Sequence, residues 1–282
     1  MDMSNLKISA FADEYADSFE EQLQALNRFG ISYIEIRHLG GKNISILEQD
    51  EVKEAKRMLD AFGIKVSAIG SPIGKIRLDQ DIRSHLEVAR HVFEAANIFD
   101  TSYVRMFSFY APEGKDISDM KNEFFCSIEK LVILAREYGV TLCHENEAKI
   151  YGDIPGRCKE LLDYFGGELK CVFDMGNFVL EGGDPYPAAY ELLKKYIAYF
   201  HIKDALKEGA IVPAGKGDAK IKEILWAHQK YAKEDFFVSL EPHLQTFSGL
   251  NSLVGRTFQN PYQYVDQKAA FTDAVAKFEE LM

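Results

Sequence analysis

Short apolar segments alternate with amphipathic segments eight times along this chain of 282 residues. The apolar segments are rich in β-branched and aromatic residues, as buried strands are, whereas apolar residues between them recur every three or four positions, as in helices. The predicted strands cover residues 7–11, 32–37, 64–70, 102–107, 140–147, 169–174, 197–203 and 236–241. The predicted helices lie at about residues 17–29, 49–62, 80–98 and 262–281, around 120–138, 158–165 and 221–225, and in a segment that ends near 195.

Regular alternation of strand and helix requires parallel strands joined by right-handed crossovers. Eight such units in 282 residues favour a (β/α)8 barrel over an open doubly wound sheet, and no G-x-G-x-x-G motif follows the first predicted strand. No change in composition divides the chain. The sequence therefore predicts an α/β fold, a single TIM barrel domain over residues 1–282.

Composition argues against several classes of protein. The longest apolar runs are far shorter than the ~20 residues of a membrane helix. A formal net charge of −11 disfavours binding to a nucleic-acid backbone. The N-terminal residues lack the basic-then-apolar pattern of a secretory signal, and no two cysteines have the CxxC spacing. We therefore expect a cytoplasmic protein with reduced thiols at Cys126, Cys143, Cys158 and Cys171.

Four of the predicted strands end in an ionisable residue: Glu145, Asp174, His201 and Glu241. In a barrel, the C-terminal ends of the strands share one rim, and catalytic residues lie there. Side chains alternate along a strand, so if these four point inward, Cys143, Val172, Tyr199 and Ser239 lie below them. Any one rim carboxylate could be a solvated or ion-paired group, but four in successive strands favour one shared site.

Three carboxylates and one imidazole make a hard, mostly oxygen ligand set for one divalent cation. Mn²⁺ is the first choice, with Mg²⁺, Co²⁺, Fe²⁺ or Zn²⁺ as alternatives. Such an ion would polarise the carbonyl group of a hydroxy-carbonyl substrate. Glu145 and Glu241 come from well-separated strands, so they could exchange a proton on opposite faces of that substrate.

At these residues the chain resembles the xylose isomerase-like barrel superfamily, in its sugar phosphate isomerase/epimerase branch, which includes ketose 3-epimerases, hydroxypyruvate isomerase and inosose dehydratase. The resemblance spans essentially the whole chain and rests on the motifs FADE, RMFSFY, HENE, FDMGN, HIKD and SLEPH. It implies that Glu145, Asp174, His201 and Glu241 bind one divalent cation, and that Glu145 and Glu241 are the acid/base pair. Glu147 shares the parity of Glu145, but it lies further into the loop.

Four neighbouring residues are candidate substrate contacts: Arg105, Lys203, His243 and Glu35. Arg105 could hold a hydroxyl, carboxylate or phosphate group, or pair with an acid such as Glu35. Lys203 could neutralise an enediolate or pair with Asp204 or Glu147. His243 could contact the substrate or a ligand. Glu35 could instead form a structural charge pair with Arg37.

Three further features have both a functional and a structural interpretation. His144 has outward parity and is expected to form a hydrogen bond between barrel and helices. Residues 213–218 could bind an anion at a helix N-terminus, or simply form a turn with Asp218 as the N-cap. The aromatic residues that follow the fourth strand could line the site or cover the core; these are Phe107, Phe109 and Tyr110.

The expected function is a metal-dependent isomerase or epimerase of a small ketose or related carbohydrate, acting through an enediolate. One rival is a lyase that dehydrates a similar substrate through the same enediolate. Another is a metallohydrolase similar to endonuclease IV, which would need more ligands and a basic face. A third is a non-enzymatic sugar-binding or regulatory barrel. The substrate, its phosphorylation, the metal and the oligomeric state, with a homo-oligomer as one alternative, stay open.

Overall fold

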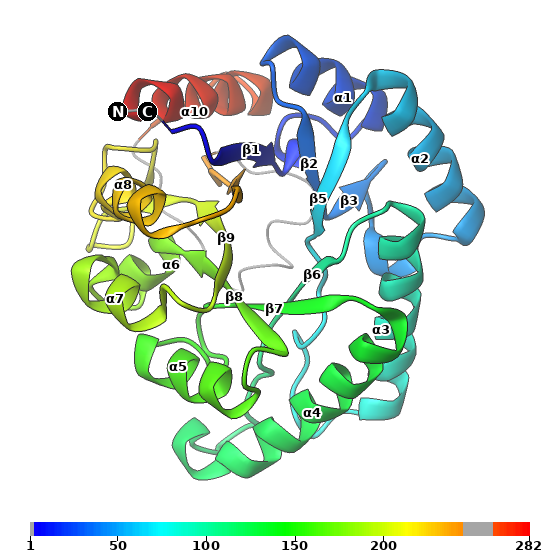
Figure 1. Ribbon diagram of the computed structural model, residues 1–282, viewed down its shortest axis with the longest axis vertical. Helices are drawn as coiled ribbons and strands as arrows, with labels where there is room; N and C mark the ends of the chain where they lie inside the picture. Colours follow the sequence, from blue (N-terminus) through cyan, green and yellow to red (C-terminus); the bar gives the residue numbers. More distant parts are fainter. Residues whose placement is uncertain (1–2, 245–261) are drawn as a thin grey trace.

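The computed structural model describes residues 3–244 and 262–282, and Figure 1 shows its strands in a ring with helices outside it. All eight ring strands are parallel, which confirms the predicted (β/α)8 barrel. They are β1 (Leu6–Ala10), β2 (Tyr33–Ile36), β5 (Lys65–Ile69), β6 (Tyr103–Met106), β7 (Thr141–Glu145), β8 (Leu169–Asp174), β9 (Ile197–Ile202) and β12 (Phe236–Leu240).

Hydrogen bonding runs around the ring in the order β1-β12-β9-β8-β7-β6-β5-β2. The first strand thus pairs with the last, and Leu6 lies opposite Phe236. β1 and β2, both wholly within the described residues, lie side by side but form no ladder (Figure 1). The barrel is therefore closed except for this one seam.

The helices follow the strands as the sequence predicts. They are α1 (Phe19–Arg28), α2 (Gln49–Phe62), α3 (Ile82–Ile98), α4 (Lys121–Tyr138), α5 (Pro155–Tyr164), α7 (Tyr190–Leu193), α8 (Ile221–Tyr231) and α10 (Gln267–Leu281). Both ends of helix α2 are set by residues next to them in the sequence. Glu48 and Glu51 form a capping box at its start, and Gly63 ends the helix in the left-handed conformation. Helix α10 begins later than predicted because Asp266 caps it by accepting from the Ala269 N–H.

Several short elements of the described residues were not predicted, and three of them contain strands or an α-helix. Two are hairpins, β3 (His38–Leu39) with β4 (Lys42–Asn43) and β10 (Asp204–Ala205) with β11 (Ile211–Val212). The third is helix α6 (Met175–Leu180), which begins directly after β8 without a loop. These elements are too short to show the periodicity on which the prediction depends.

The interior of the barrel contains a small cluster of its own, which includes Cys143, Val172 and Tyr199. These residues lie two positions before Glu145, Asp174 and His201, so the strands alternate as the sequence predicts. The interior also holds polar groups: the Ser9 and Ser67 hydroxyls lie 2.6 Å apart. The main hydrophobic core lies between the strands and the surrounding helices.

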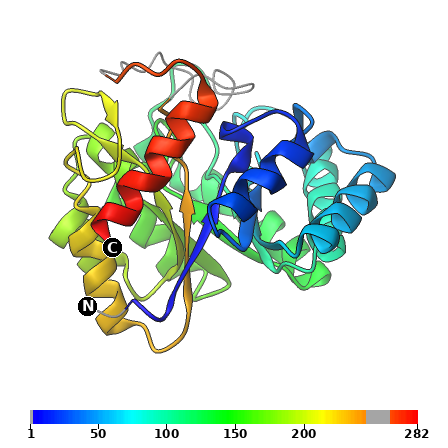
Figure 2. The same ribbon diagram turned by 90° about the horizontal axis from the view of Figure 1, so that it is seen from above.

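Helix α10 lies along the outside of the barrel next to the first strand and helix (Figure 2). Its Phe271 ring contacts Tyr15 and Phe29, 5.9 and 6.1 Å away between ring centroids. Helix α10 therefore packs against the segment that follows β1 and against the end of α1. None of the helices within the described residues has the length and apolar character needed to cross a membrane.

The loop that follows β9 is held by a carboxylate of the protein itself. Asp204 accepts hydrogen bonds from the backbone N–H groups of Gly215, Gly217, Ala219 and Ala205, at 2.8–3.0 Å. The expected anion site in residues 213–218 is therefore filled by Asp204.

The expectation that Asp218 is an N-cap is wrong. Lys220 occupies the N-cap position of α8, and Asp218 accepts from the Lys207 N–H at 3.1 Å. Gly217 is required beside the Asp204 carboxylate, because a Cβ atom there would lie 2.2 Å from Asp204 Oδ1.

Replacing this buried acceptor should destabilise the barrel. We expect Asp204→Asn to lower the free energy of unfolding by about 2–3 kcal/mol, because the amide supplies one acceptor and turns a donor toward backbone N–H groups. The measurement is urea unfolding followed by circular dichroism. The matched control, Asp218→Asn, keeps an oxygen that can accept the single hydrogen bond from the Lys207 N–H and should cost less than about 1 kcal/mol. Equal stability of the two variants would contradict this role for Asp204.

Candidate functional site

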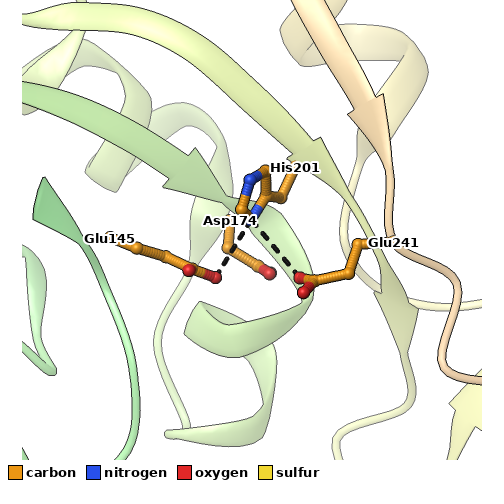
Figure 3. Close-up of side chains that lie close together, drawn as sticks. All are labelled: Glu145, Asp174, His201 and Glu241. Atoms are coloured by element: carbon orange, nitrogen blue, oxygen red, sulfur yellow. Dashed lines mark hydrogen bonds and ion pairs between the residues drawn. The ribbon is translucent and has the colours of Figure 1, made fainter. Parts of the chain in front are cut away.

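Four side chains from neighbouring strands meet at the C-terminal ends of β7, β8, β9 and β12 (Figure 3). The four are the predicted set: Glu145, Asp174, His201 and Glu241. One ligand atom from each lies within 4.8 Å of the others, and each residue is at most 3% exposed. Parallel strands bring their last residues to one rim, so the sequence pattern becomes a cluster in space.

His201 is surrounded by carboxylates on both ring nitrogens. Its Nδ1 atom lies 3.1 Å from Glu145 Oε1 and 3.3 Å from Glu241 Oε2, and its Nε2 atom lies 3.1 Å from Glu35 Oε2. Burial alone would lower the pKa of His201, but the attraction of Glu145, Glu35 and Glu241 outweighs burial and raises this pKa well above its ordinary value. The imidazole is therefore a cation when no metal is bound.

Two further cations neutralise the carboxylates. Lys203 Nζ lies 2.8 Å from Asp174 Oδ2 and 3.0 Å from Glu241 Oε2. Arg105 Nη1 lies 3.2 Å from Glu145 Oε2 and 3.6 Å from Glu241 Oε1. Burial would raise the pKa of both glutamates, but His201 with Arg105 lowers that of Glu145, and Lys203 with His243 and His201 lowers that of Glu241. Both glutamates are therefore held ionised.

Asp174 differs from the two glutamates, because burial dominates and raises its pKa to about 7. Glu145 and Glu241 add to the rise and Lys203 opposes it. A proton thus competes for this carboxylate near neutral pH.

The cluster fits a divalent cation by its chemistry. Three carboxylate oxygens and one imidazole nitrogen are a typical hard donor set. Glu145 Oε2 is buried and makes no hydrogen bond, although Arg105 lies close to it. A buried carboxylate oxygen without a donor is costly, and a bound cation would remove that cost. The residues that could hold the ion are Glu145, Asp174, His201 and Glu241.

Asp174 is held by the unpredicted helix α6, of which it is the N-cap. Its Oδ1 atom accepts from the Asn177 N–H at 2.8 Å. The Asn146 side chain bridges to the Asp174 backbone, accepting from its N–H at 3.0 Å and donating to its carbonyl at 2.9 Å. Gly176 lets the helix approach β9, because a Cβ atom would lie 2.8 Å from the Lys203 carbonyl oxygen.

Arg37 joins a second layer of charges that the sequence did not indicate. Its guanidinium donates to both oxygens of Asp13 at 2.8 and 2.9 Å, to Glu14 at 3.3 Å and to Glu241 at 2.9 Å. The proposed structural partner, Glu35, instead contacts His201 and Tyr199. The FADE motif contains Asp13 and Glu14, but nothing in it indicates that these two acids contact Arg37.

A second acid and histidine group, Glu14, Glu241 and His243, shares Glu241 with the first. Arg37 already lies between its two carboxylates, 2.9 Å from Glu241 and 3.3 Å from Glu14. Within the described residues these are the only two such groups, so the ligand set suits one cation rather than the several of a multinuclear hydrolase.

The predicted substrate contacts lie in two places. Arg105, Lys203 and His243 surround Glu241, with His243 Nε2 3.5 Å from its Oε1 atom. Glu35 is 1% exposed and contacts Nε2 of His201, whereas Glu145 and Glu241 contact Nδ1 on the other side of the ring. Its assignment as a substrate contact therefore stays a prediction.

The remaining candidates are structural neighbours of the cluster. His144 faces away and lies 3.0 Å from the Ser108 hydroxyl, in the segment after β6 rather than in a helix. Glu147 pairs with Lys75 at 3.4 Å. The Phe107 ring packs against the cations of Lys75 and Arg105, 4.3 and 4.9 Å from its centroid.

Comparison with known proteins gives a consistent result for the fold. The family model described as xylose isomerase-like TIM barrel matches residues 23–259. A search of curated proteins by sequence found no match.

Three solved structures illustrate the similarity. D-psicose 3-epimerase with D-tagatose from Clostridium cellulolyticum H10 has a TM-score of 0.75 at 15% identity, covering 98% of each chain. AsbF from Bacillus anthracis, described as a probable 3-DHS dehydratase, has a TM-score of 0.74 at 18% identity, again over 98% of each chain. The IOLI protein with a binding zinc atom has a TM-score of 0.73 at 17% identity, covering 98% of this chain and 97% of that chain. At these identities the likeness is one of fold.

The affinity of the cluster for a divalent cation should depend on pH in two regimes. His201 must lose a proton to bind the cation below its raised pKa, and Asp174 must lose a second one below its pKa of about 7. The logarithm of the affinity should therefore rise with pH, with a slope about one unit steeper below pH 7 than just above it. Competition with a chromophoric chelator for Mn²⁺ between pH 5.5 and 8.5 measures this.

The control for this prediction is Lys203→Met. Losing the lysine removes the attraction that holds down the pKa of Asp174, so the change of slope should move to higher pH. A single slope in wild type, or an unmoved break in the variant, would show that Asp174 does not titrate in this way.

Proposed function

The chain belongs to the xylose isomerase-like TIM barrel family, and we propose that it is a divalent-metal-dependent isomerase or epimerase of a small ketose or related polyhydroxy carbonyl compound. The observation that carries the proposal is the placement of Glu145 and Glu241. They approach the cluster from opposite sides, with Asp174 and His201 between them (Figure 3). A substrate bound there would present a different face to each carboxylate.

A divalent cation held by Glu145, Asp174, His201 and Glu241 would supply Lewis-acid polarisation of the substrate carbonyl. The chain supplies the proton transfers. One glutamate removes the proton from the carbon next to the carbonyl, and the electron pair moves onto the carbonyl oxygen to give an enediolate. If the other glutamate takes up a proton from solvent and delivers it to the opposite face of that carbon, the product is the epimer. Protonation of the neighbouring carbon gives the isomer.

The cations around the glutamates support this role. Arg105 Nη1 lies within 3.6 Å of both carboxylates, and Lys203 lies 3.0 Å from Glu241. These charges favour the ionised form that a base needs, and they would also offset negative charge that develops on the enediolate. We propose Arg105, Lys203 and His243 as the substrate-binding residues on this basis.

The relatives support the chemical class. One similar structure is a ketose epimerase holding a ketose, and another contains a zinc atom. The similarity to AsbF raises dehydration as an alternative outcome, because an enediolate can also expel a β-hydroxyl group.

The decisive experiment is incubation with free ketoses and ketose phosphates in D₂O with Mn²⁺. We expect an epimer or isomer that carries deuterium next to the carbonyl, detected by NMR and mass spectrometry. Glu145→Gln and Glu241→Gln should each lower the epimerisation rate by about 10²–10⁴-fold. Each single variant should still exchange the proton of one epimer only, because one base remains on one face.

The control for metal loss is Asp174→Asn, which removes a ligand but neither proposed base. Its activity should recover partly at saturating Mn²⁺, whereas the two glutamate variants should not recover. Unchanged rates in both glutamate variants would overturn the acid/base assignment. A product lighter by one water would identify a dehydratase instead.

A further inference from the structure

Glu35 has contacts that neither substrate binding nor a pair with Arg37 explains. Its carboxylate is 1% exposed, and it contacts both His201 and Tyr199, which belongs to the cluster inside the barrel. Its Oε2 and Oε1 atoms lie 3.1 and 3.3 Å from His201 Nε2. The Tyr199 hydroxyl donates to Oε1 at 3.1 Å, so the carboxylate is itself held from the strand that carries His201.

The two nitrogens of His201 therefore face different partners. Nδ1 is directed at the carboxylates of Glu145 and Glu241 in the cluster. Nε2 is directed at the carboxylate of Glu35. An ionised carboxylate only accepts hydrogen bonds, so it keeps the proton on Nε2. The lone pair of a neutral His201 then lies on Nδ1, the side on which a cation would bind.

The ring itself is fixed in orientation. Phe11 packs edge-on against His201 with 5.1 Å between ring centroids, and Tyr199 lies 5.5 Å away on the same strand. Gly70 makes room for Phe11, because a Cβ atom there would lie 2.5 Å from the Phe11 ring. The position of Nδ1 thus depends on the interior of the barrel as well as on β9.

We propose that Glu35 is a positioning residue that selects the Nδ1 lone pair of His201 for the metal and strengthens that ligand. This inference rests on the metal site of the proposed function. A carboxylate on the distal nitrogen orients a ligating histidine and increases its basicity, and its loss typically costs 10–100-fold in metal affinity. Glu35 also adds a negative charge that favours a cation in the cluster.

Two variants separate the hydrogen bond from the charge. Glu35→Gln removes the charge but keeps an oxygen that can accept from Nε2, and Glu35→Met removes both. The matched control is Glu147→Gln, which removes one negative charge at the same rim from a residue paired with Lys75 rather than with His201. Thermal melts of the metal-free proteins establish that each variant is folded.

The first readout is affinity for Mn²⁺ or Zn²⁺ by chelator competition, independent of any activity. We expect about 10–100-fold weaker binding in Glu35→Met, a smaller loss in Glu35→Gln, and less than about threefold in Glu147→Gln. The second readout is NMR of the ¹⁵N-histidine-labelled, Zn²⁺-loaded protein. Wild type should show a strongly hydrogen-bonded Nε2–H proton from His201, which is lost in Glu35→Met.

The outcomes distinguish this inference from the proposed function. Wild-type affinity in both folded Glu35 variants would overturn the role of Glu35 and leave the metal site standing. An equal loss in Glu35→Gln and Glu147→Gln would also overturn it, since the effect would then be long-range charge. Failure of wild type to bind any divalent cation would overturn both proposals.

Discussion

Burial of three carboxylates at one point is the constraint on which the rest of the site depends. Glu145, Asp174 and Glu241 are each at most 3% exposed, and uncompensated charges at such depth would cost several kcal/mol each. Cationic side chains from three strands of the barrel, or from the residues that directly follow them, offset this cost. Arg105 comes from β6, Lys203 follows β9, Arg37 follows β2, and His201 provides a titratable cation. A bound divalent cation would add to this compensation. Stability of the fold and binding of a cation therefore both depend on neutralising the same buried carboxylates.

Sequence predicted the strands, most helices and the meeting of the four strand-end residues, because each depends on a local pattern. Period-two alternation located Cys143, Val172 and Tyr199 in the interior, and parallel strand ends meet by topology. It could not predict which cation neutralises which acid. Arg37 contacts Glu241 over 204 positions, and nothing local indicates such a pair. The sequence likewise gives no local signal that Glu35 contacts Nε2 of His201 rather than Nδ1.

The positions of the four clustered side chains depend on two parts of the structure. The strands fix the backbone of each residue, and neighbouring groups outside the cluster orient the side chains. Asp174 is oriented by the backbone of α6, a helix that starts on the very next residue, and Asn146 links the ends of β7 and β8. Structures at 15–18% identity share the barrel over nearly their whole length. A fold this tolerant can keep its strands while the orienting groups change, and function has to be argued from those groups.

The seam between β1 and β2 also has a consequence for the order of folding. Among the strands that the structure describes, β1 (Leu6–Ala10) forms a ladder only with β12, which begins at Phe236. Contacts between segments so far apart in sequence form late in folding. Closure of the ring is therefore expected to be a late step, and Glu241 joins Glu145, Asp174 and His201 only at that step. Most of the barrel can then exist before the cluster is complete.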